Sequence, residues 1–118
     1  MSLDSIHHTI QAATNAFKEK LALHFDVSQT FLFGSMARHT EHAESDTDIA
    51  VVLNGETGKI IDTKFAMDDL AYEVLLDTGV RIQPLPIWLN EWENPTGYPN
   101  PSLLFNIQRE GLLITDAK

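Results

Sequence analysis

The residues with the clearest chemical potential form two short groups in the first half of the chain. Gly34 and Ser35 make up the first group, and Asp46 and Asp48 the second, with residues 36–45 between them. A glycine lets the backbone approach a phosphate closely, and a serine at the start of a short helix adds a hydroxyl and backbone N–H donors. The first group therefore predicts a phosphate-binding turn.

The two aspartates offer the other half of a triphosphate site. Asp46 and Asp48 are two residues apart at the start of an apolar run, so an extended backbone places both carboxylates on one side. Carboxylate oxygens are hard ligands that suit Mg²⁺. In such a site metal ions bridge phosphate oxygens, activate an attacking hydroxyl and offset charge on the leaving pyrophosphate. We therefore expect Asp46 and Asp48 to bind metal beside a nucleoside triphosphate.

The elements that must position these residues alternate between helix and strand. Their apolar spacing and turn residues predict a helix over 5–25, strands over 27–33 and 49–53, a helix capped by Asp62 and Gly79, a strand over 80–87, a loop over 88–101, and a helix from Pro101 to Gly111. Asp4 or Ser2 can cap the first helix. The near-continuous apolar strand at 49–53 should be covered on both faces. The expected fold class is α/β (α+β), a small mixed sheet flanked by helices.

Prolines and aromatic residues mark the second half of the chain. Pro84 and Pro86 confine the strand over 80–87 to an edge of the sheet. Trp88, Trp92 and Tyr98 are interpreted either as anchors that pack the following loop against the domain or as a partner-binding patch. The sequence leaves both interpretations open.

The Gly-Ser pair, the spacer and the Asp-x-Asp group together resemble the signature of the DNA polymerase β-type nucleotidyltransferase superfamily. The whole chain resembles its minimal single-domain members (MNT domains), which implies one polymerase β-like domain over residues 1–118. This resemblance implies that Gly34 and Ser35 contact the β and γ phosphates of ATP. It also implies that Arg38 and Ser45 help to hold the nucleotide.

The same resemblance assigns the catalytic and Mg²⁺-binding roles to Asp46 and Asp48, and it exposes two departures. His39 stands where many relatives carry glycine after the arginine, which should alter only the loop. Active members carry a third carboxylate on the following strand, whereas residues 81 and 83, which share a face, are arginine and glutamine. Possible substitutes are Glu41, Glu44, Asp68, Asp69, Glu73 and Asp77. The last four are expected on the solvent side of their helix.

Composition limits the partners. Seventeen acidic and eight basic residues give a net charge of −9, so the chain should repel polynucleotides and need a metal ion to hold a nucleotide. The absence of cysteine excludes disulfides and thiolate metal sites. The first residues lack a signal peptide, and no run approaches the ~20 apolar residues of a membrane span. A cytoplasmic protein without a membrane partner is expected.

Three functions agree with these residues. In the first, AMP is transferred from ATP to a hydroxyl of another protein; the resemblance implies a helical HEPN-type toxin as that partner, with this chain as its antitoxin. In the second, favoured by the missing carboxylate, the chain is a nucleotide-binding module that neutralises a partner by complex formation. In the third, which the short chain disfavours, a small molecule is modified. Homo- and hetero-oligomers both remain open.

Overall fold

The computed structural model describes residues 3–34 and 46–114, and its centre is a four-stranded mixed sheet. The strands are β1 (Val27–Phe33), β2 (Thr47–Leu53), β3 (Ile82–Trp88) and β4 (Leu112–Leu113), in the order β3-β2-β1-β4. β1 runs antiparallel to β2 and β4, whereas β2 and β3 are parallel. The mixed sheet and the α+β class that the sequence predicts are confirmed.

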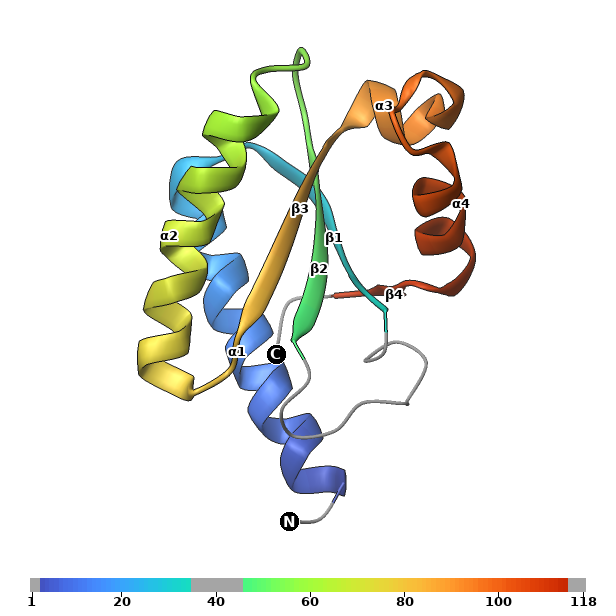
Figure 1. Ribbon diagram of the computed structural model, residues 1–118. Coiled ribbons are helices and arrows are strands. Elements are labelled where there is room, and N and C mark those ends of the chain that lie inside the picture. The colour runs from blue at the N-terminus through green and yellow to red at the C-terminus, as the bar shows by residue number, and fades with distance from the viewer. Residues whose placement is uncertain (1–2, 35–45, 115–118) are drawn as a thin grey trace.

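Helices cover both faces of the sheet (Figure 1). α1 (Leu3–His24) and α2 (Ile60–Thr78) pack on one face, and α3 (Leu89–Glu93), the 3-10 turn η1 (Pro95–Gly97) and α4 (Pro101–Glu110) pack on the other. Within the described residues, none of these helices has the length and apolar character needed to cross a membrane.

β2 is the central strand of the core, as its apolar run predicts. Ile49, Val51 and Leu53 are buried with residues of α1 and α2, while Ala50 is buried with residues of α4. Successive side chains of a strand point to opposite faces, so one apolar strand can contribute to two cores. The same alternation places Asp48 on the face that α4 covers.

Some predicted helix boundaries are wrong. α1 begins at Leu3, so Asp4 lies inside the helix instead of capping it, and Ser2 lies outside the described residues. Lys59 is the N-cap of α2, without a side-chain cap, and Asp62 lies in the first turn. There its carboxylate still faces the positive end of the helix dipole. Gly79 ends α2 in the left-handed conformation, as predicted.

The stretch predicted as a loop over 88–101 contains α3 and η1, so that prediction is wrong in part. The packing interpretation of its aromatic residues is confirmed. Trp88 and Tyr98 are buried, and Trp92 stacks on Phe31 with ring centroids 5.0 Å apart. β4 was not predicted, because a pair of residues is too short to show strand periodicity.

Candidate active site

Asp48 lies near the start of β2, between the two neighbouring strands. It is in register with Phe33 at the end of β1 and with Gln83 near the start of β3. Asp46 precedes β2 by one residue. β1 ends at the same end of the sheet where the parallel strands β2 and β3 begin (Figure 1). Gly34, which follows β1, and the two aspartates at the start of β2 therefore lie at one end of the sheet.

Gly34 lies directly against the carboxylate of Asp48. Its backbone has a φ of 74°, and a Cβ built on it would lie 2.5 Å from Asp48 Oδ2. A left-handed φ is strained for residues other than glycine. A separation of 2.5 Å between the Cβ and Oδ2 is too short for a carbon and an oxygen that are not bonded to each other. Glycine is therefore favoured at position 34 for two reasons: its left-handed conformation, and the space that the Asp48 carboxylate occupies.

Asp46 is contacted by Arg81, which directly precedes β3, and by Gln83 in β3. Arg81 Nη1 lies 3.7 Å from Asp46 Oδ1, and Gln83 Nε2 donates to Asp46 Oδ2 at 3.4 Å. The arginine and the aspartate side chains are 65% and 40% exposed, so this ion pair contributes only about 0–1 kcal/mol. Arg81 and Gln83 therefore lie where the family resemblance implies a third carboxylate. Neither side chain can act as the base in its place.

The electrostatics of the aspartate pair favour a bound cation. Burial raises the pKa of Asp48 above its ordinary value, and the nearby charge of Asp46 raises it further. A divalent cation would offset both effects, because it attracts the two charged carboxylates and replaces lost hydration. Two hard oxygen donors beside a glycine backbone thus fit Mg²⁺ and a phosphate group.

The other predicted site residues divide into two groups. Ser35, Arg38 and Ser45 lie outside the described residues, as do the substitute acids Glu41 and Glu44. The substitutes on α2, which are Asp68, Asp69, Glu73 and Asp77, belong to the helix on the opposite face of the sheet from Asp48. Asp68 pairs with Lys64 and Glu73 with Lys20, so these acids are surface charges as predicted. No cluster of three or more potential metal ligands occurs within residues 3–34 and 46–114.

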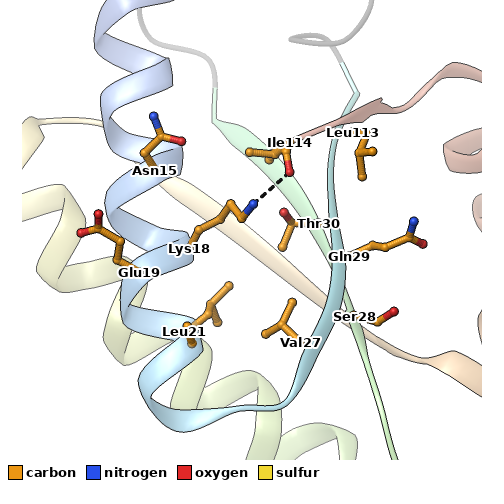
Figure 2. A pocket seen from close by; sticks show the side chains of 11 residues that line it. Asn15, Lys18, Glu19, Leu21, Val27, Ser28, Gln29, Thr30, Leu113 and Ile114 are labelled. Atoms are coloured by element: carbon orange, nitrogen blue, oxygen red, sulfur yellow. Dashed lines mark hydrogen bonds between the residues drawn. The ribbon is translucent and has the colours of Figure 1, made fainter. Parts of the chain in front are cut away.

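A separate groove of about 700 Å³ lies between α1 and β1 (Figure 2). Lys18 Nζ donates across it to the carbonyl oxygen of Ile114 at 3.0 Å. The Thr30 hydroxyl faces the same space, is buried and has no hydrogen-bond partner among the described residues. This groove lies on the α1 face, across the sheet from Asp48, and contributes nothing to the aspartate site.

The fold and the site define a class of protein: a small mixed-sheet domain with a close-packed glycine turn facing an Asp-x-Asp strand is typical of nucleotidyltransferases. Residues 15–86, more than half of the chain, match the family described as "Polymerase beta, Nucleotidyltransferase". The chain belongs to this family. The resemblance inferred from the motif, and the polymerase β-like fold it implies, are confirmed.

Solved structures support the same fold. A Sulfolobus solfataricus protein provisionally assigned as a nucleotidyltransferase has a TM-score of 0.60 at 18% identity, covering 96% of this chain and 87% of its own. A toxin-antitoxin with AMP-PNP has a TM-score of 0.61 at 19% identity, covering 88% of this chain and 73% of its own. A mutant of the toxin-antitoxin MntA-HpeT has a TM-score of 0.59 at 19% identity, with coverage of 89% and 73%. None of the curated proteins matches this sequence.

Proposed function

We propose that this chain is a cytoplasmic, Mg²⁺-dependent nucleotidyltransferase that moves AMP from ATP to a hydroxyl of a protein partner. The observation that carries the proposal is the contact between the Gly34 backbone and the Asp48 carboxylate, since it joins the phosphate half of the site to the metal half. Asp46 and Asp48 are the residues that would hold Mg²⁺. When bound, the metal would neutralise the triphosphate and activate the acceptor hydroxyl.

In the proposed reaction the acceptor oxygen attacks the α-phosphorus of ATP and forms the new phosphoester bond. The bond from that phosphorus to the pyrophosphate breaks, and pyrophosphate leaves with the electron pair. Gly34, together with Ser35, Arg38 and Ser45, is proposed to hold the phosphates in line for this displacement. The proton of the acceptor hydroxyl leaves to solvent or to a base of the acceptor protein, because Arg81 and Gln83 cannot accept it.

The proposed partner is a helical HEPN-type toxin, with this chain as its MNT antitoxin. Support comes from two similar structures: one is a toxin-antitoxin with AMP-PNP and the other is a toxin-antitoxin MntA-HpeT mutant. A protein acceptor also suits a net charge of −9, which disfavours nucleic acid.

One observation favours a second function, that of a nucleotide-binding module that neutralises its partner without modifying it. Asp46 is contacted by the guanidinium of Arg81, just before β3, and by the amide of Gln83 in β3, and neither group is a carboxylate. A site that lacks the base and one metal ligand can still bind a nucleotide and sense it.

An intact-mass experiment separates the two functions. The chain is incubated with the protein encoded by the neighbouring gene, ATP and Mg²⁺, and both masses are recorded. The transferase predicts that the partner gains the mass of AMP, and that Asp48→Asn abolishes the gain. Glu19→Gln, which changes an exposed acid on α1, is the matched control and should retain transfer. A stable complex without any mass gain would reject the transferase and leave the binding module.

A further inference from the structure

α2 carries apolar side chains on its outer side as well as on its core side. Met67, Leu70, Ala71 and Val74 are buried against the sheet and α1. Four other large apolar residues of the same helix are 59–67% exposed, namely Ile61, Phe65, Tyr72 and Leu76. At 100° per residue their spacing places them within an arc of about 60°, on the side away from the core. We call these four residues the α2 stripe.

The stripe consists of two pairs of side chains along the helix, and its N-terminal pair borders a hollow. From Ile61 to Leu76 it extends roughly 22 Å along the helix axis. At its N-terminal end, α2 and β3 enclose an apolar hollow of about 410 Å³, lined by Ile60, Ile61, Lys64, Phe65, Leu85 and Pro86. Several large apolar side chains exposed on one side of a helix, next to an apolar hollow, mark an interaction site.

Charge beside the stripe indicates which kind of partner fits. Asp62, Asp69, Glu73 and Asp77 form an acidic row along one side of it, and Lys20 of α1 pairs with Glu73 in that row. Lys64, the one basic residue of α2, is already engaged by Asp68 at 2.6 Å. Two copies of this surface would bring two acidic rows together in a chain whose net charge is −9, which disfavours a homodimer through α2. A partner with basic residues beside its own apolar stripe is complementary.

The neighbouring strand indicates the form of that partner. The carbonyl of Arg81 accepts from Thr47 N, so residues 81, 83 and 85 direct their backbone groups toward β2. Pro84 and Pro86 therefore lie at the open edge of β3, where neither can donate a backbone hydrogen bond. An added strand cannot form a regular ladder there. Docking beside this edge must use side chains, as a helix does.

We propose that the α2 stripe docks an amphipathic helix of a partner protein. That helix has at least about 15 residues, an apolar stripe bordered by Lys or Arg, and one large apolar side chain that enters the hollow next to Phe65. This inference rests on the proposed function in one respect: it takes the partner to be the protein that this chain modifies or neutralises. It adds where that protein binds.

The test measures binding of the neighbouring-gene protein to four forms of the full chain. Phe65→Glu introduces a charge into the stripe at an exposed position, and Leu23→Glu makes the same change on α1, where Leu23 is 80% exposed. We expect Phe65→Glu to raise Kd by about tenfold or more, and Leu23→Glu to leave Kd within about twofold of the wild-type value. Asp69→Lys should weaken binding at low salt, and added salt should reduce that effect. Thermal unfolding of each variant checks that it is folded.

Three results would overturn the inference. They are equal Kd values for Phe65→Glu and Leu23→Glu, no binding by the wild-type chain, and a homodimer of the isolated chain that Phe65→Glu dissociates. The last result would make a second copy the occupant of the stripe. AMP transfer is measured separately. Binding through the stripe without transfer would reject only the enzymatic proposal. Transfer by Phe65→Glu with an unchanged Kd would reject only the docking proposal.

Discussion

Replacing Gly34 with alanine tests whether the glycine turn and the aspartate form one site. The new Cβ would lie 2.5 Å from Asp48 Oδ2, whereas an ordinary contact begins near 3.4 Å. The Asp48 carboxylate must therefore move by about 1 Å, since the other atom of the contact is fixed to the backbone. A shift of this size in a group that orients reacting atoms costs about 10²-fold in rate.

The substitution also affects stability through the backbone. An alanine held at a φ of 74° costs about 1–2 kcal/mol. For a domain of this length, each kcal/mol lowers the melting temperature by about 3–6 °C. Gly34→Ala should therefore remain folded at room temperature while it loses activity.

Gly79→Ala is the matched control. Gly79 has a φ of 77°, and its Cβ would meet no atom within 4 Å. The two variants should show similar losses in urea or thermal unfolding, and only Gly34→Ala should lose Mg²⁺-dependent AMP transfer or nucleotide binding. Equal activity of the two variants would refute the reasoning, because the contact with Asp48 would then have no functional consequence.

Two further predictions concern titratable groups. Gln83→Glu places a carboxylate in the position where Gln83 now donates to Asp46, so without Mg²⁺ the free energy of unfolding should fall by about 0.5 kcal/mol. Added Mg²⁺ should stabilise this variant more than it stabilises the wild type. Thermal melts with and without Mg²⁺ measure both effects, and Gln29→Glu is the control that should show no Mg²⁺ dependence. Burial raises the pKa of Tyr98 above its ordinary value of 10.0, so Tyr98 stabilises the fold below pH 10 and this contribution is lost as the pH rises through the higher folded value. In Tyr72→Phe the whole tyrosinate absorbance comes from Tyr98, and a midpoint at or below 10 would contradict the shift.

The parts of the fold that the sequence predicts well are those with a strong local signal. The apolar run of β2 indicates a strand buried on both faces, and Pro84 and Pro86 indicate the edge position of β3 because proline removes a donor. Helix starts were less predictable. Asp62 has the side chain of a good N-cap, but the helix begins earlier because Ile60 and Ile61 also continue its period.

The candidate site was predictable in residue type but not in its contacts. The spacing of Gly34 and Asp48 indicates that they belong together, because strand pairing must bring the end of one strand to the start of the next. The contacts of Arg81 and Gln83 with Asp46 depend on β3 lying parallel to β2 with Asp48 opposite Gln83, and no local pattern specifies that register. The outer stripe of α2 was not predicted, because the exposure of apolar side chains depends on which elements pack against the helix, and no local pattern specifies that packing.

The aspartate site and the α2 stripe lie on opposite faces of the sheet, and this arrangement restricts how a partner can use both. α2 ends at Thr78, and the chain then leads directly to Arg81, whose exposed side chain lies beside Asp46. A helix docked along α2 thus comes near the site only beyond Leu76, at the C-terminal end of the stripe. The segment that carries the acceptor hydroxyl should therefore extend past that end and turn around the start of β3. Because the Arg81–Asp46 pair is exposed and weak, an incoming segment or a metal ion can displace it at little cost.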